Sequence, residues 1–202
     1  MCGIIGYTGS EDVKGVLLDA LELLEYRGYD SAGIAVADTD VKQTKVYKCA
    51  GRVKDLRAIC ESEKLITECG IGHTRWATHG GVNDTNAHPH QVGKVTLVHN
   101  GIIENYRELI VDYELESVLK SETDSEVVAA LLNKFYTGDP DEAIKKTVSK
   151  LKGTFALVIL FEDHQGEIYS ARNVSPIVAT LCKEGAMLAS DLTALCRFTN
   201  RY

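Results

Sequence analysis

A cysteine directly after the initiator methionine is the first residue of this chain that could carry chemistry. Cysteine is small enough for removal of the methionine, so we expect the mature chain to begin with Cys2, its thiol and its α-amine. A thiol attacks as the thiolate, and an N-terminal amine with a pKa of about 7.7–8.0 can accept the thiol proton near neutral pH. Because most cysteines at this position have no catalytic role, the hypothesis depends on polar residues elsewhere.

A polar stretch begins at Arg75 and continues through Trp76, Thr78 and His79, after a run that predicts a strand over 69–74. An isolated Arg-Trp pair is more often a surface arginine stacked on the indole ring. The density of polar side chains in this stretch instead favours a binding site.

The pair Asn100-Gly101 follows a predicted strand over 94–99 and precedes a predicted helix over about 104–116. An Asn-Gly pair often indicates a hairpin turn, but no second hairpin arm follows here. A side-chain amide beside a main-chain N–H is the pair of donors that an oxyanion hole requires.

Asp124 lies in the sequence Thr-Asp-Ser-Glu, which has the spacing of a capping box before a helix predicted over 126–136. Standing alone, a carboxylate in a first helical turn is explained by the helix dipole. Its role in a site therefore depends on the other polar groups.

His88 and His90 flank Pro89 and could be taken for metal ligands. No carboxylate or cysteine stands at a fitting spacing, so we interpret them as hydrogen-bonded supports of a loop. We predict neither a metal nor a cofactor.

The composition is that of an ordinary soluble globular protein, with 202 residues, 45% hydrophobic and 25% charged. A formal net charge of −7 argues against binding to nucleic acid or to an anionic membrane. The six cysteines form no CxxC pair, and no signal peptide or membrane span is apparent. We therefore expect reduced thiols, a cytoplasmic location and one domain over 1–202.

Hydrophobic periodicity predicts a mixed order of strands and helices with few βαβ units. A strand over 2–7, apolar on both faces, should lie centrally and place Cys2 at one end of a sheet. We predict an α+β fold in four layers, an αββα sandwich of two antiparallel sheets with helices outside. The remaining expected elements are a helix over 11–25 capped by Ser10, a hairpin of 32–38 and 43–50, a short helix near 53–60, a helix after Asp139, and strands over 154–161, 167–171, 176–181 and 186–190.

Several separate motifs together resemble the class II glutamine amidotransferases. Within that family they are most similar to the N-terminal glutaminase domains of the glucosamine-6-phosphate synthases. The motifs are Cys2-Gly3-Ile4, LEYRGYDSAGIAV from Leu24, GHTRWATHG from Gly72, NAHPH from Asn86, HNGIIENY from His99 and SETDSEV from Ser121. The resemblance implies a fold of the N-terminal-nucleophile (Ntn) hydrolase type and a chain excised from a longer protein.

The resemblance also implies a role for each matching residue. Cys2 corresponds to the nucleophile and, through its α-amine, to the general base, while Asn100 and the N–H of Gly101 correspond to the oxyanion hole. The substrate-holding positions are Arg75 for the glutamine α-carboxylate, Asp124 for its α-ammonium, Trp76, Thr78 and His79 for the pocket walls, and Arg27 close to the nucleophile.

The implied reaction is hydrolysis of L-glutamine through a γ-glutamyl thioester, with ammonia passing to fructose 6-phosphate in the full enzyme. A sugar-phosphate isomerase domain is then expected in the full-length protein, and a homodimer is conceivable. Two alternatives stay open: a non-catalytic glutamine-sensing module, and the glutaminase domain of a related amidotransferase with another acceptor. Two positions depart from the family pattern, Val174 in place of a glycine and Val82 in place of a common proline.

Overall fold

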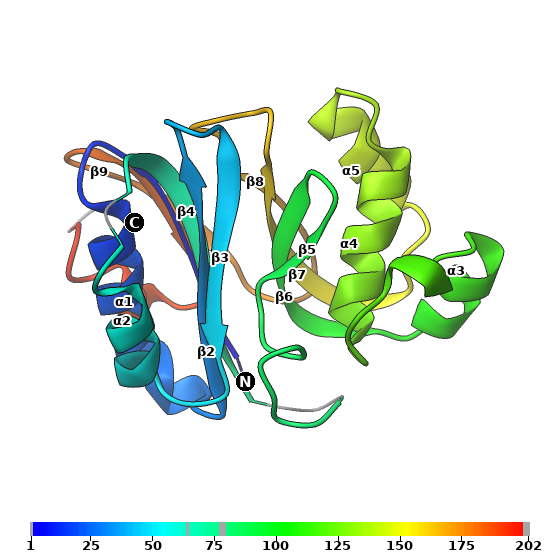
Figure 1. Ribbon diagram of the computed structural model, residues 1–202, viewed down its shortest axis with the longest axis horizontal. Coiled ribbons are helices and arrows are strands. Elements are labelled where there is room, and N and C mark those ends of the chain that lie inside the picture. The colour runs from blue at the N-terminus through cyan, green and yellow to red at the C-terminus, as the bar shows by residue number, and fades with distance from the viewer. Residues whose placement is uncertain (1, 64, 77–79, 200–202) are drawn as a thin grey trace.

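Strands with apolar side chains on both faces decide the architecture of this protein. In the computed structural model, which describes residues 2–63, 65–76 and 80–199, ten strands form two antiparallel sheets that pack face to face. Helices cover the outer face of each sheet, so the order of layers is helices, sheet, sheet, helices (Figure 1). The predicted αββα sandwich is confirmed.

The larger sheet has six strands in the order β3-β2-β4-β1-β10-β9, and every neighbouring pair is antiparallel. The first strand is an inner strand of this sheet, as its apolar sequence predicted. The bounds are β1 Gly3–Gly9, β2 Ser31–Asp38, β3 Gln43–Cys49, β4 Thr67–Arg75, β9 Val178–Cys182 and β10 Gly185–Ala189.

The smaller sheet has four antiparallel strands in the order β5-β6-β7-β8. Its long central pair joins Val95–Ile103 to Gly153–Phe161 over nine residues. The bounds are β5 His90–Val92, β6 Val95–Ile103, β7 Gly153–Phe161 and β8 Tyr169–Asn173.

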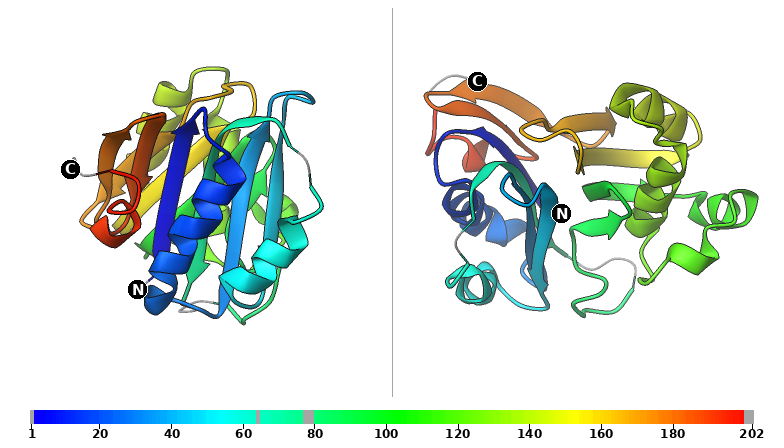
Figure 2. Two further views of the ribbon diagram at one scale, coloured as in Figure 1. Left: turned by 90° about the vertical axis from the view of Figure 1, so that its left-hand side faces the viewer. Right: turned by 45° about the horizontal axis from the view of Figure 1, so that its top comes forward.

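The helices divide between the two outer faces. The helices α1 (Val13–Leu24) and α2 (Val53–Cys60) lie across the six-stranded sheet, as the left view of Figure 2 shows. The other group, α3 (Tyr106–Asp112), α4 (Asp124–Phe135) and α5 (Pro140–Val148), lies on the side of the four-stranded sheet. The described residues also form short 3₁₀ helices: η1 Glu25–Arg27 lies between α1 and β2, η2 Glu116–Val118 lies between α3 and α4, and η3 Leu192–Ala194 follows β10.

Three apolar clusters fill the three spaces between the four layers. Because successive side chains of a strand point to opposite faces, neighbours in sequence belong to different clusters: Ile4 lies between the sheets, whereas Ile5 packs under α1. On β7, Val158 lies between the sheets, whereas Ile159 belongs to the cluster between the four-stranded sheet and its helices. Every second side chain of these inner strands therefore contributes to the apolar cluster between the two sheets.

The N-terminal ends of α1 and α4 differ from the expectations, each for a local reason. Ser10 does not cap α1, because its hydroxyl donates to Glu184 while Asp12 occupies the cap position. In α4, Thr123 does cap the helix, accepting from the N–H of Glu126, and the helix begins two residues earlier than predicted. The Glu126 carboxylate accepts from the main chain of Lys120 instead of closing a capping box.

The largest correction concerns the predicted helix over 104–116. The strand β6 continues through Asn100 and Gly101 to Ile103, because β7 pairs with it along its whole length. The helix α3 therefore begins only at Tyr106, and β5 was not predicted at all. None of the described helices is long and apolar enough to span a membrane.

Candidate active site

The space between the two sheets changes from apolar to polar at one end. On the inner face of β4, Ile71 is followed by His73 and Arg75 at alternate positions. On the inner face of β6, Val98 is followed by Asn100 in the same way. Strand alternation therefore brings polar side chains of both sheets to the end where β1 begins.

Cys2 stands just before β1, and its thiol contacts the main chain that follows β4. Its Sγ accepts from the N–H of Trp76 at 3.2 Å and donates to the Trp76 carbonyl at 3.6 Å. Burial raises the pKa of the Cys2 thiol, and the Trp76 N–H offsets part of that effect. The thiol is therefore protonated at neutral pH and needs a base before it can attack.

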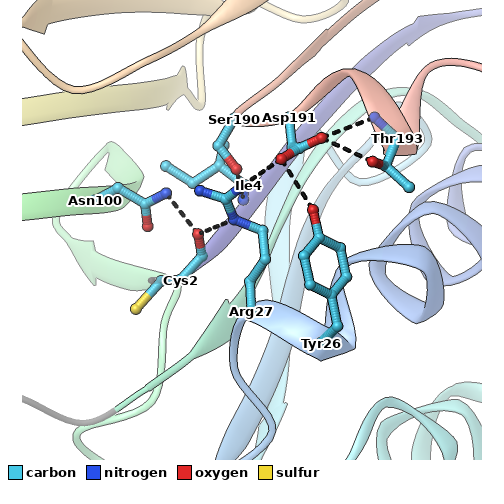
Figure 3. A network of polar contacts seen from close by, with 8 residues as sticks. All are labelled: Cys2, Ile4, Tyr26, Arg27, Asn100, Ser190, Asp191 and Thr193. Carbon is cyan, nitrogen blue, oxygen red and sulfur yellow. Dashed lines mark hydrogen bonds and ion pairs between the residues drawn. The ribbon is translucent and has the colours of Figure 1, made fainter.

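The main-chain carbonyl of Cys2 accepts from two side chains that are distant in sequence (Figure 3). Asn100 donates through Nδ2 at 3.0 Å, and Arg27 donates through Nε at 3.4 Å. Arg27 also forms an ion pair with Asp191, whose Oδ2 accepts from the hydroxyl of Tyr26 at 2.9 Å. The nucleophile candidate is thus fixed to β6, to η1 and to the segment after β10.

Arg75 and Asp124 lie with Cys2 around a cavity of about 40 Å³. Arg75 is 4% exposed, and its guanidinium donates to the carbonyls of Gly81 at 3.2 Å and Gly80 at 3.5 Å. Asp124 accepts from the N–H of Ile103 at 2.8 Å. A cavity of this size has room for little more than one water molecule, so a larger ligand requires its walls to move.

Gly101 lines both this cavity and a second one of about 290 Å³, which Cys2 and Trp76 also share. Its φ of +139° belongs to a region that favours glycine. A Cβ at this position would stand 2.0 Å from the carbonyl oxygen of Thr154, so no larger residue fits. The second cavity is also lined by Arg27, Ser175 and Pro176.

The structure brings together seven of the nine predicted site residues. Cys2, Arg75, Trp76, Gly101 and Asp124 line the smaller cavity, and Arg27 and Asn100 line the larger one with Cys2. The other two, Thr78 and His79, lie outside the described residues.

Comparison with known proteins explains why these residues meet. A glutamine amidotransferase domain family matches residues 73–197. The glutamine–fructose-6-phosphate aminotransferase (isomerizing) of Bacillus licheniformis is 47% identical over 206 residues, which cover 100% of this chain and 34% of the relative. This chain belongs to the glutamine amidotransferases. The corresponding enzyme of Thermus thermophilus is 48% identical over 204 residues, covering 100% of this chain and 33% of the relative.

Solved structures confirm the fold of the amidotransferase. The glutamine phosphoribosylpyrophosphate amidotransferase of B. subtilis, solved with ADP and GMP, superposes with a TM-score of 0.81 at 26% identity, over 96% of this chain and 43% of that one. A structure described as the allosteric regulatory enzyme of purine biosynthesis gives a TM-score of 0.83 at 27% identity over the same shares. The αββα sandwich of this amidotransferase is therefore of the Ntn-hydrolase type.

The two histidines of the loop before β5 differ from each other. His90 shares a hydrogen bond of 3.0 Å with the hydroxyl of Thr123, as expected of a loop support. For His88 the expectation is wrong: neither ring nitrogen has a partner among the described residues, because its ring packs between those of His73 (4.1 Å) and His90 (4.7 Å). Within the described ranges, no three His, Cys, Asp or Glu side chains could hold a metal ion together.

Sequence reasoning missed three contributors to the site of the amidotransferase. The main chain of Trp76 contacts the thiol, although only its side chain had been considered. Nothing in the sequence indicated that Asp191 belongs to the site, since a lone aspartate after a strand indicates only a helix cap. It does cap η3, accepting from the N–H of Thr193. His73 stood inside a predicted strand, where a histidine is unusual enough to have drawn attention.

Proposed function

We propose that this chain hydrolyses the side-chain amide of L-glutamine to glutamate and ammonia, with the Cys2 thiol as nucleophile. The observation that supports this most is that the residue Cys2 lines a cavity together with Arg75 and Asp124. Free glutamine carries a carboxylate and an ammonium on one carbon, which a bidentate arginine and an opposed carboxylate can bind. Glutamine held in this way presents its side-chain amide to the thiol.

The proposed reaction has two halves. The thiol proton passes to the α-amine of the processed N-terminus, and the sulfur attacks the amide carbon while Asn100 and the N–H of Gly101 donate to the developing oxyanion. The C–N bond then breaks, and the ammonium returns the proton to the leaving nitrogen, which departs as ammonia. Water attacks the γ-glutamyl thioester, the C–S bond breaks, and glutamate leaves with the thiol restored.

The environment of the thiol supports the need for an amine base. Because burial raises the pKa of Cys2 above its usual value, while the α-amine has a pKa of about 7.7–8.0, moving the proton costs about 1.4 kcal/mol per unit of difference. That cost is small beside a reaction barrier, so an adjacent amine suffices. The same proposal assigns Trp76, Thr78 and His79 to the walls of the glutamine pocket.

The chain spans about a third of the length of the curated relatives that it matches. The activity of the whole protein is therefore also part of the proposal: ammonia passes to fructose 6-phosphate, giving glucosamine 6-phosphate on a sugar-phosphate isomerase domain. The two fructose-6-phosphate aminotransferases, at 47% and 48% identity, are more similar to this chain than the phosphoribosylpyrophosphate enzyme at 26%. This difference supports fructose 6-phosphate as the acceptor. No disulfide joins any two of the six cysteines, all of which lie in the described residues, and this supports a reducing compartment such as the cytoplasm.

Incubation of the processed chain with glutamine tests the proposal directly. We expect glutamate and ammonia in equal amounts, with intact mass showing that Met1 is absent. Cys2→Ala should abolish turnover and leave glutamine affinity nearly unchanged, because Arg75 and Asp124 remain. A folded, processed chain that binds glutamine and releases no glutamate would instead be a glutamine sensor.

A further inference from the structure

A buried histidine connects the two sheets directly behind Cys2. His73 lies on β4, is 1% exposed, and points across the interface toward β6. Its Nε2 is 3.1 Å from the carbonyl oxygen of His99 and 3.1 Å from Oδ1 of Asn100. No function described so far uses this side chain.

The chemistry of these partners fixes the tautomer of the histidine. The carbonyl oxygen of His99 can only accept a hydrogen bond, so Nε2 of His73 must carry the hydrogen and donate it. The same N–H faces Asn100, which must therefore present its oxygen to His73. The opposite amide orientation would place two N–H donors against each other.

A second, independent carbonyl demands the same orientation of the amide. The Cys2 carbonyl oxygen is also only an acceptor, and it lies 3.0 Å from the other end of the Asn100 amide. Only Nδ2 can make that contact, as Figure 3 shows. The assignment of oxygen and nitrogen in Asn100 thus follows from two main-chain carbonyls, one through His73 and one directly.

We infer that His73 is a positioning residue that holds the Asn100 amide with its N–H₂ group toward Cys2 and its oxygen away. This inference rests on the proposed function, in which Asn100 donates to the oxyanion. The N–H₂ group has two hydrogens, so one can hold the Cys2 carbonyl while the other donates to substrate. Without His73, only the Cys2 carbonyl still favours this orientation, so the amide turns its oxygen toward the oxyanion more often, and that oxygen repels the oxyanion.

The surroundings of His73 keep its ring neutral. Burial, with a smaller contribution from the nearby His99 and Arg75, lowers its pKa to about 3, although the hydrogen bonds to Asn100 and to the His99 carbonyl oppose the shift. The ring of His88 packs against it at 4.1 Å. A neutral ring has one N–H, and the contacts place that N–H at Nε2, so the donor to Asn100 is present across the pH range in which the reaction runs.

The test is a comparison of His73→Leu and His73→Gln in the glutaminase assay. Leucine removes the donor, and we expect kcat to fall about 10- to 100-fold with KM for glutamine within about threefold. The side-chain nitrogen of glutamine is as many bonds from Cβ as Nε2 of histidine, so His73→Gln should recover most of kcat. Full kcat in a folded His73→Leu chain would overturn the inference.

A double-substitution cycle separates positioning from general damage to the core. If His73 acts through Asn100, adding His73→Leu to Asn100→Ala should lower kcat by less than about twofold. If the double variant instead lost kcat by the product of the two separate losses, the two residues would act independently, and the inference would be contradicted. The matched control is Thr74→Val, because Thr74 is the next residue of β4, is fully buried, and its hydroxyl has no partner within the described ranges; we expect kcat and KM to be unchanged.

If His73→Leu does not fold, His73→Gln and His73→Asn decide the question. Both bury an amide, but the asparagine nitrogen cannot reach the place of Nε2, so Gln should be active and Asn impaired in kcat. Equal kcat values would overturn the inference. Failure of the proposed function is distinguishable, because it would appear as no turnover in the unsubstituted chain.

Discussion

Cys2 is held by contacts at both its carbonyl and its thiol. The carbonyl accepts from Asn100 and Arg27, and the thiol contacts the main chain of Trp76 on its other side. At the scale of single residues, the backbone of the candidate nucleophile is therefore fixed before any substrate arrives. Because the nucleophile is already positioned, less entropy is lost when the thiol and its substrate reach a reactive geometry.

The first prediction concerns the base. A tag placed before Met1 and shown to be retained leaves an amide nitrogen on Cys2, which cannot accept the thiol proton. We expect a folded chain whose glutaminase rate is lower by at least about 10²–10⁴, the usual contribution of one proton-transfer group. In the processed chain, activity should rise with pH through an apparent pKa at or below about 8, because only the neutral amine is a base.

The control for the tag is the same tag after Tyr202. Circular dichroism verifies folding, and intact mass verifies the N-terminus in both proteins. Equal rates in the two would rule out a role for the α-amine.

The second prediction concerns Arg75, which is almost fully buried beside the small cavity. In Arg75→Lys a single ammonium replaces the planar fork that matches a carboxylate. We expect KM for glutamine to rise at least about tenfold, or about 1.4 kcal/mol in binding. Arg57→Lys is the control. Arg57 of α2 forms ion pairs with Asp19 and Glu22 of α1 at the surface, so this substitution should leave KM unchanged. An unaltered KM in Arg75→Lys would contradict carboxylate binding.

At the scale of elements, the segment between β8 and β9 carries backbone strain next to the larger cavity. Val174 has a φ of +69°, is exposed, and precedes the cavity residues Ser175 and Pro176. A β-branched residue is disfavoured in the left-handed region by about 1–2 kcal/mol. The other departure from the family pattern, Val82, is also exposed but has no positive φ.

The third prediction is that Val174→Gly stabilises the protein by about 1 kcal/mol, because relief of strain exceeds the entropy that glycine adds to the unfolded chain. Thermal unfolding should then shift upward by about 2–4 °C. Val82→Gly is the matched control and should not stabilise, since it adds the same entropy with no strain to relieve. A decrease in melting temperature for Val174→Gly would contradict the argument.

At the scale of the whole molecule, buried neutral histidines make stability depend on pH. Burial lowers the pKa of His73 to about 3 and the pKa values of His88 and His90 well below their usual value. Below pH about 6.5 the unfolded chain protonates these side chains and the folded chain does not. Since the unfolded state then binds more protons, stability is complete above pH about 6.5 and is lost as pH falls toward about 3.

The fourth prediction follows from this sign. Urea unfolding at pH 7.5 and 5.5 should show a lower free energy of unfolding at pH 5.5, with up to about 1.4 kcal/mol per pH unit from each of the three histidines. His88→Phe should make the free energy of unfolding less dependent on pH, by up to about 1.4 kcal/mol per pH unit, because one proton fewer is bound on unfolding. A free energy of unfolding that is the same at both pH values would contradict the prediction.

The sequence by itself determined the layers and predicted the kinds of chemistry. Apolar residues on both faces of segments such as Gly3–Gly9 and Gly153–Phe161 require cover on both sides, which leads to a sandwich. The residue types of Cys2, Arg75 and Asp124, together with the family motifs around them, predict a thiol nucleophile and a zwitterionic ligand. Both depend on local pattern and side-chain identity, which a sequence contains in full.

Only the tertiary structure decided which side chains face one another. Alternation predicts that His73 and Asn100 lie on inner faces, but the packing of the two sheets puts them 3.1 Å apart. In the same way, the ion pair of Arg27 and Asp191 joins positions 164 apart in sequence, and β7 pairing extended β6 past Asn100. Register and packing depend on the sum of many weak contacts over the whole chain, so no local pattern specifies them.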